Sequence, residues 1–344
     1  MTVSTPIIEV QNLKKWFPIR TGIRSFFGEQ RWVKAVDGID FDVKSGDSLV
    51  IAGESGSGKT TLVRTMLRLI EPTAGSVNFE GEPVFTMLPD DLRLFRRRVQ
   101  LIFQNPFEVL DPRHTVKDLV GEGLVVHELV SDEEELMRRV LNALEDVRLI
   151  PAEDFSRRFP HELSGGQLQR VAIARSLILE PKLVIADEPV SMLDASIRTE
   201  IMNLMTDLQK EHNLTYIFIT HDLAQARYIG NWLIIMYLGK VMEMGPMEDI
   251  LQDPIHPYTQ ALISHIPIPD PTEERHRIDI PGETPTPIDL PPGCRFRPRC
   301  QAIDEYCTDD EPELQQIGPN RWVACHGWEA RKKKKHKLRH SSER

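Results

Sequence analysis

Residues 53–60 read GESGSGKT, a loop of small residues that ends in one lysine and one threonine. An apolar run precedes the loop and a helical pattern follows it, so the expected order is strand, loop, helix. Such a loop curls its backbone N–H groups around a phosphate, and the helix N-terminus adds partial positive charge. Lys59 should reach the β- and γ-phosphates of a nucleoside triphosphate and Thr60 should hold Mg²⁺. The expected phosphate-binding residues are Gly53, Ser55, Gly56, Gly58, Lys59, Thr60 and Thr61.

Two carboxylates end a second apolar run, LVIADE at 183–188. This run is typical of a buried parallel strand, and ligands bind beyond the carboxyl ends of such strands. We expect Asp187 to hold the Mg²⁺ shell and Glu188 to polarise the attacking water. Gln104, at the end of the apolar run 99–103, is a further candidate for contact with Mg²⁺ or water. Taken alone, a glutamine at that place is usually a loop residue.

A second anion site is predicted at LSGGQ, residues 163–167, which leads directly into a helical pattern. Ser164, Gly165 and Gly166 place small side chains and backbone N–H groups at that helix N-terminus, and Gln167 completes the motif. The chain therefore has two places suited to phosphate.

The elements around these motifs alternate between strands and helices. Trp16 ends the first expected strand, where an aromatic ring can stack on adenine for about 1–3 kcal/mol; a core or edge aromatic is the alternative reading. Residues 107–162 read as a helical insertion, with a capping-box pattern at Ser131 and Glu134. The other expected strands are 7–17, 33–43 and 75–84.

Composition limits the partners. The formal net charge is −10 although the last residues, 331–344, are strongly basic, so the rest of the 344-residue chain is acidic and nucleic acid is not expected as a partner. The basic end is expected to be a disordered tail, with contact to anionic lipid or RNA as the alternative. The longest apolar run, 232–238, is too short to span a bilayer, and the N-terminus lacks a signal-peptide pattern. We therefore expect a cytoplasmic chain unless a partner holds it at a membrane.

All four cysteines, Cys294, Cys300, Cys307 and Cys325, lie in one proline-rich segment with few large apolar residues. A reducing cytoplasm disfavours disulfides, so a metal site with four thiolates is favoured. Structural zinc usually binds pairs of cysteines that are separated by two to four residues, and no two of these four cysteines are so close in the sequence. Wide intervals suit an iron–sulfur cluster better, while zinc, or His326 in place of one cysteine, stays open.

Taken together, these motifs resemble the ATP-binding subunits of ABC transporters over roughly residues 7–265. GESGSGKT, Gln104, LSGGQ, LVIADEP, SMLD at 191–194 and His221 occur in that family's order and spacing. The resemblance implies that Trp16 stacks on adenine, Gln104 couples to the membrane subunit and Glu188 is the catalytic base. It also implies that Asp194 lies in the inter-subunit loop and that His221 contacts the γ-phosphate.

The C-terminal part is similar to the extension of oligopeptide and dipeptide importer ATPases, through DPIHPYTQAL at 253–262 and PPGCRFRPRC at 291–300. That resemblance implies a [4Fe-4S] cluster on the four cysteines. The expected fold is an α/β, P-loop (RecA-like) core with an antiparallel β subdomain, an inserted helical subdomain at about 107–170 and a small Cys-rich extension. The expected domains are 1–265, 266–330 and the basic tail 331–344.

The resemblance also implies a mechanism, because two anion sites cannot close on one γ-phosphate within one subunit of this fold. In a head-to-tail dimer, the phosphate loop of one subunit faces Ser164 and Gly166 of the other, and the second subunit is a paralogue or another copy. ATP-driven closure would rock two membrane permeases, and an extracytoplasmic binding protein would supply the cargo. The chain would then lie peripherally on the cytoplasmic face of the membrane.

Peptides are the expected cargo, with oligosaccharides as an alternative. A soluble ABC ATPase of DNA repair or ribosomes is a second reading, but the chain has neither a long coiled-coil insertion nor tandem LSGGQ units. A P-loop kinase or GTPase is disfavoured by LSGGQ, and an exporter by the lack of fused membrane helices.

Overall fold

The computed structural model describes residues 5–19, 30–266, 277–288, 290 and 292–331. The chain forms two compact units, each of which collects segments from distant parts of the sequence. By their described residues, the first unit comprises Met1–Ile8, Asp42–Ser48 and Asn78–Ile219, and the second comprises Glu9–Phe41, Leu49–Val77 and Thr220–Arg344. The predicted basic tail lies outside the described residues except for Arg331.

The first unit contains three parallel strands in the order β8-β7-β6. Every residue of β7 is buried, as its unbroken apolar sequence predicts for a strand covered on both faces. The elements of this unit are β5 (Glu82–Pro83), η2 (Val84–Thr86), α2 (Pro89–Arg98), β6 (Val99–Ile102), α3 (Pro106–Val109), α4 (Val116–Val126), α5 (Glu133–Asp146), α6 (Ala152–Ser156), η3 (Pro160–Glu162), α7 (Gly165–Leu177), β7 (Leu183–Asp187), α8 (Ala195–His212) and β8 (Thr215–Thr220).

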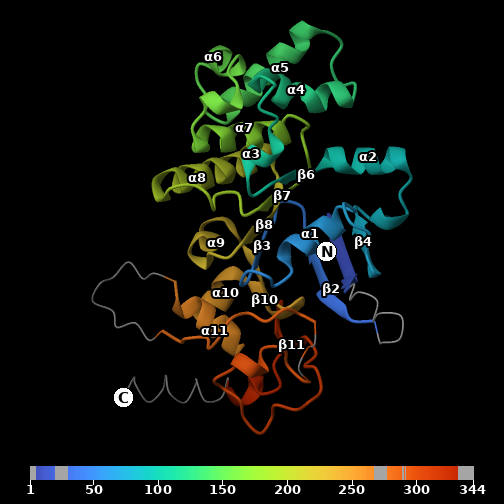
Figure 1. Cartoon of the computed structure of the whole chain (residues 1–344), viewed down its shortest axis with the longest axis vertical. Helices are drawn as coiled ribbons and strands as arrows, with labels where there is room; N and C mark the ends of the chain where they lie inside the picture. The colour runs from blue at the N-terminus through green and yellow to red at the C-terminus, as the bar shows by residue number, and fades with distance from the viewer. Residues whose placement is uncertain (1–4, 20–29, 267–276, 289, 291, 332–344) are drawn as a thin grey trace. The chain divides into compact units, whose positions relative to one another are not determined.

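Helices α4, α5 and α6 lie within the predicted helical insertion at 107–162 and pack against one another, and α4 and α5 also pack against α7 (Figure 1). The predicted capping box at the start of α5 is wrong by one residue. Asp132 is the N-cap and accepts from the Glu135 backbone N–H at 2.8 Å, while the Glu135 carboxylate accepts from the backbone N–H of Ser131. Asp is as good an N-cap as Ser, so two adjacent candidates with a run of glutamates leave the sequence pattern ambiguous.

The expected strand at 75–84 is instead a tight hairpin followed by a 3₁₀ turn. Strand β4 (Ala74–Phe79) pairs antiparallel with β5, Phe79 opposite Glu82. The two turn residues, Glu80 and Gly81, both have positive φ, at 51° and 86°. Positive φ at both positions is what a two-residue hairpin turn of type I′ requires.

The second unit holds the glycine-rich loop at 53–58 and the segment that contains the four cysteines, Cys294 to Cys325, which we call the cysteine-rich segment. Its larger sheet has the order β11-β12-β10-β9-β3, with β3 and β9 parallel and the remaining pairs antiparallel. The elements are β1 (Ile8–Pro18), β2 (Trp32–Val43), β3 (Ser48–Ala52), α1 (Lys59–Met66), β4, α9 (Leu223–Ile229), β9 (Trp232–Tyr237), β10 (Lys240–Pro246), α10 (Met247–Gln252), α11 (Pro257–Ser264), η4 (Arg297–Arg299), β11 (Gln315–Gly318) and β12 (Arg321–Val323).

The cysteine-rich segment completes its core with residues from elsewhere in this unit. Strand β12 pairs with β10, and Val323 and Cys325 pack with Ile255. Glu243, on β10, is the pairing partner of Val323 and is fully buried. Its carboxylate accepts hydrogen bonds from the backbone N–H of His256 at 2.9 Å and from Arg321 at 2.9 Å. A buried carboxylate needs such partners, because removing one typically costs about 3–5 kcal/mol. No helix among the described residues is long and apolar enough to cross a membrane.

Candidate active site

The loop at 53–58, which we call the phosphate loop, joins β3 to α1, as expected. Two of its glycines are required because the backbone of other segments comes close to them. Gly58, the N-cap of α1, has φ 103°, and a Cβ there would lie 2.0 Å from the Ala35 carbonyl oxygen. A Cβ on Gly53 would lie 2.2 Å from the Met236 carbonyl oxygen. Ser55 and Gly56 are exposed at the tip. The loop is thus a tight backbone turn that presents its tip to solvent.

Lys59 is buried and bends back onto the loop that precedes it. Its Nζ donates to the carbonyl oxygens of Gly53 at 2.7 Å and Glu54 at 3.0 Å. The ammonium group therefore lies inside the curve of the loop, where a phosphate oxygen can replace a carbonyl as its partner. Thr60 and Thr61 follow in the first turn of α1 and are half-buried.

Trp16 lies near the end of β1 and is half-buried. Its indole N–H donates to the Asp37 carboxylate at 2.9 Å, and the Lys34 ammonium lies 4.8 Å from the ring centroid. Burial works to raise the pKa of Asp37, but the hydrogen bond and charge of Arg295 outweigh it and lower the pKa below its ordinary value. Asp37 is therefore an ionised anchor that fixes the plane of the Trp16 ring.

The structure brings Gln104 and Glu188 together in the first unit. The Gln104 side chain donates to Glu188 Oε2 at 3.1 Å. Glu188 follows Asp187 at the end of β7 and has φ 48°, a left-handed conformation that is uncommon for a residue with a side chain. Its backbone N–H donates to Ile219 and its carbonyl accepts from the Ser191 hydroxyl, which hold this turn. Backbone strain of this kind is common at active sites, where a side chain must point in one defined direction.

The second predicted anion site begins α7, also in the first unit. Ser164 and Gln167 form a reciprocal capping box, with the Gln167 side chain accepting from the Ser164 backbone N–H at 3.0 Å. A Cβ on Gly166 would lie 2.5 Å from the Ile197 side chain, so Gly166 lets α7 approach α8. Gly165 is half-buried and Ser164 is exposed. Asp194 is exposed and caps α8.

His221 is exposed in the turn between β8 and α9 and belongs to the second unit with the phosphate loop. Asp187, Glu188, Gln104 and the LSGGQ motif belong to the first unit. The predicted roles of these residues toward a nucleotide stay predictions.

The four cysteines are reduced, Cys325 buried and the others half-buried. The Arg331 guanidinium contacts the Cys325 sulfur at 2.6 Å and also binds the carboxylate of Asp304. Burial raises the pKa of Cys294 to about 11 and that of Cys325 to about 12. Within the described part of the chain, no three His, Cys, Asp or Glu side chains converge closely enough to hold one metal ion.

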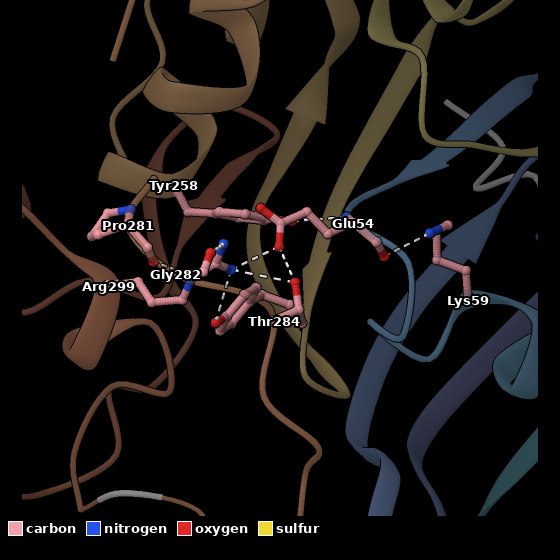
Figure 2. Close-up of polar contacts among 8 residues, drawn as sticks. Glu54, Lys59, Tyr258, Pro281, Gly282, Thr284 and Arg299 are labelled. Atoms are coloured by element: carbon pink, nitrogen blue, oxygen red, sulfur yellow. Dashed lines mark hydrogen bonds and ion pairs between the residues drawn. The ribbon is translucent and has the colours of Figure 1, made fainter. Parts of the chain in front are cut away.

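The sequence did not predict the contacts that distant residues make with Glu54 in the phosphate loop. Figure 2 shows Arg299, from the cysteine-rich segment, directed at the Glu54 carboxylate with Thr284 beside it; the Arg299–Glu54 distance is 2.7 Å. Two signals were available: Glu54 is the one charged residue of the loop before Lys59, and Arg299 directly precedes Cys300. Neither indicates that residues so distant in the chain meet.

Comparison with known proteins identifies the family of the chain. The ABC transporter family profile matches residues 36–191, and that of the oligopeptide/dipeptide transporter C-terminal region matches 242–307. The chain is 43% identical to the putative oligopeptide transport ATP-binding protein YkfD of Bacillus subtilis (strain 168), covering 93% of this chain and 95% of YkfD. It is 41% identical to the dipeptide transport ATP-binding protein DppF of Haemophilus influenzae (strain ATCC 51907 / DSM 11121 / KW20 / Rd), covering 94% and 97%.

Solved structures agree. The post-hydrolysis dimer of the ATP-binding cassette MJ0796 bound to ADP and Pi matches with a TM-score of 0.61 and 30% identity, covering 70% of this chain and 98% of that one. Clostridium perfringens cbiO1, part of the ABC transporter complex cbiONQ, matches with a TM-score of 0.60 and 30% identity, covering 72% and 91%. These matches confirm the expected fold. The chain is therefore an ABC ATPase and belongs to the family of oligopeptide and dipeptide transport ATP-binding proteins.

Proposed function

We propose that this chain is the ATP-hydrolysing subunit of an importer of di- or oligopeptides. It would lie on the cytoplasmic face of the membrane with two permeases and a second ATPase subunit, either a paralogue or another copy. The observation that carries the cargo assignment is that the match to peptide-transport relatives continues through the C-terminal region at 242–307. A separate extracytoplasmic binding protein would deliver the peptide.

The chemistry is assigned to Glu188, supported by its contact with Gln104 at 3.1 Å. Glu188 takes a proton from the attacking water, and Gln104 keeps the carboxylate aimed. Lys59 binds the β- and γ-phosphate oxygens, and His221 contacts the γ-phosphate. We assign Mg²⁺ binding to Thr60, Asp187 and Gln104, and the ion would supply positive charge that offsets the negative charge of the phosphates.

The second half of the site comes from a facing subunit. The exposure of Ser164 and Asp194 supports this, because both begin helices that a second subunit can reach. The N-terminus of α7 would bind the γ-phosphate held by the partner's loop. ATP binding then closes the dimer, and loss of the γ-phosphate reopens it.

Coupling to the permeases is assigned to the segment after Gln104 and to the helical insertion. Phe107 of α3 is 61% exposed, and Val125 and Val126 at the end of α4 are 57% and 52% exposed. Exposed apolar side chains of this size are suited to an interface with another protein.

Peptide uptake tests the proposal. Proteoliposomes containing this chain, its two permeases and the binding protein should accumulate a labelled tripeptide when ATP is supplied on the ATPase side. Omitting this chain should abolish uptake, and a labelled oligosaccharide is the matched cargo control. Uptake of the oligosaccharide alone would overturn the peptide assignment. Failure of the chain to co-purify with the permeases, while it still hydrolyses ATP, would indicate a soluble ABC ATPase instead.

We further propose that Cys294, Cys300, Cys307 and Cys325 bind a [4Fe-4S] cluster with a structural or regulatory role. The support is the chemistry of the donors, because four thiols lie in one segment and Arg331 offers positive charge next to the Cys325 sulfur. The four sulfurs do not converge in this structure, so cluster binding would have to draw them together. The His256 ring nitrogen Nε2 lies 3.9 Å from the Cys294 sulfur. Its Nδ1 accepts from the Tyr258 backbone N–H, so the proton is on Nε2 and points toward the thiol.

Metal content decides between cluster and zinc. Protein purified without oxygen should be brown and contain about four irons and four sulfides per chain. Replacing Cys325 by serine should remove the colour, whereas Ser131→Ala, on the helical insertion, should leave it unchanged. A colourless wild-type protein with one zinc per chain would reject the cluster, and a metal-free protein whose segment resists proteolysis would reject both.

A further inference from the structure

The phosphate-loop residue Glu54 is bound on three sides by residues that follow it by about two hundred positions or more. Its carboxylate accepts from Arg299 Nη1 at 2.7 Å and from the Thr284 hydroxyl, and its backbone N–H donates to the Tyr258 hydroxyl at 2.9 Å (Figure 2). The Glu54 carbonyl in turn accepts from Lys59 Nζ at 3.0 Å. The peptide units that orient Lys59 are therefore fixed from outside the loop.

Arg299 is held so that its direction is defined. It is 8% exposed, and its Nε and Nη2 donate to the carbonyl oxygens of Pro281 and Gly282, both at 2.9 Å. Nη1 also contacts the hydroxyl of Tyr237, whose ring packs 4.9 Å from that of Tyr258. A planar guanidinium can satisfy this set of partners at once, whereas a lysine ammonium cannot.

A second arginine from the same segment, Arg295, is linked to Trp16 through Asp37, at the predicted adenine end of the site. Arg295 is 3% exposed and donates to the Asp37 carboxylate and to the Leu238 carbonyl oxygen. Asp37 accepts the Trp16 indole N–H at 2.9 Å through its other oxygen. The ring that is expected to stack on adenine is thus anchored through one carboxylate to Arg295.

Both arginines lie between Cys294 and Cys300 in the sequence CRFRPRC. We infer that Arg299 and Arg295 are positioning residues for ATP: Arg299 fixes the phosphate loop through Glu54, and Arg295 fixes Trp16 through Asp37. The cysteine-rich segment therefore sets nucleotide affinity. The Arg299 part rests only on the phosphate loop, and the Arg295 part also rests on the proposed stacking of adenine on Trp16.

The test measures equilibrium binding of a fluorescent ATP analogue to the purified full chain, with unlabelled ATP and inorganic tripolyphosphate as competitors. Arg299→Met should raise the Kd of both competitors by about 5- to 150-fold, the usual range of coupling between two sites. Arg295→Met should raise the Kd of ATP but leave that of tripolyphosphate within about twofold. Arg297→Met is the matched control, because Arg297 pairs with the exposed Asp309 and should leave both values unchanged.

A double variant distinguishes positioning from general destabilisation. If Arg299 acts through Glu54, adding Glu54→Gln to Arg299→Met should give little further loss, whereas additive losses would contradict the inference. Should Arg299→Met fail to fold, Thr284→Val removes a smaller part of the same contact and should raise the Kd of both competitors less. Equal Kd values for Arg299→Met and Arg297→Met, or for Thr284→Val and wild type, would overturn the Arg299 assignment. Equal weakening of ATP and tripolyphosphate by Arg295→Met would overturn the Arg295 assignment.

These outcomes are independent of peptide transport, because binding is measured without permeases. A null result here would leave the uptake experiment and its assignment unaffected.

Discussion

Replacement of Glu188 by glutamine is expected to lower ATP turnover by about 10²- to 10⁴-fold, the usual loss when a general base is removed. ATP binding should persist, because Lys59 and its loop, which are expected to bind the phosphates, are unchanged. Glutamine has nearly the same shape and can still accept the hydrogen bond from Gln104, so the local geometry should survive. With hydrolysis blocked, ATP should hold the subunits in a stable dimer.

Phosphate release and light scattering check this expectation together. Glu200→Gln is the matched control, because Glu200 forms a surface ion pair with Arg170 at 3.2 Å and should have little effect on turnover. Lys59→Ala should instead lose ATP binding. Near-normal phosphate release by Glu188→Gln would rule out Glu188 as the base.

Much of the fold was predictable because its main signals are local. The phosphate loop, the strand β7 and the helical insertion each follow from a continuous stretch with a clear pattern, such as the apolar run that ends at Asp187. The hairpin at 75–84 was missed because the two positive-φ residues, Glu80 and Gly81, interrupt a pattern that otherwise reads as one strand. The N-cap of α5 was misplaced because Ser131 and Asp132 are both good caps.

The contacts of Glu54 and Asp37 were not predictable, because a sequence pattern does not specify which distant charge pairs with which. Arg299 follows Glu54 by 245 positions and Arg295 follows Asp37 by 258. Both arginines are buried, which a sequence without an alignment does not indicate, since arginine is usually exposed. The Gln104–Glu188 contact itself was not predicted, although each residue ends an apolar run and each was a candidate for contact with the attacking water.

Replacement of Ser164 by arginine is expected to abolish hydrolysis at the site of the facing subunit. The long, charged side chain would occupy the N-terminus of α7, where the partner's γ-phosphate should bind. The substitution also removes the Ser164 capping box, which should lower the free energy of unfolding by about 1 kcal/mol. Thr115→Arg is the matched control, because Thr115 caps α4 with the same kind of box. That variant loses a similar cap and should keep its activity.

The central claim is that ATP is split in a site shared by two subunits, and a mixing experiment tests it most directly. Ser164→Arg chains and Lys59→Ala chains should each be inactive alone. Mixed in equal amounts, they form dimers in which one site has an intact Lys59 from one chain and an intact Ser164 from the other. Hydrolysis should then return to about one quarter of the wild-type rate if the chain pairs with itself and assorts at random. A mixture that contains verified mixed dimers but releases no more phosphate than its two components would contradict the shared site.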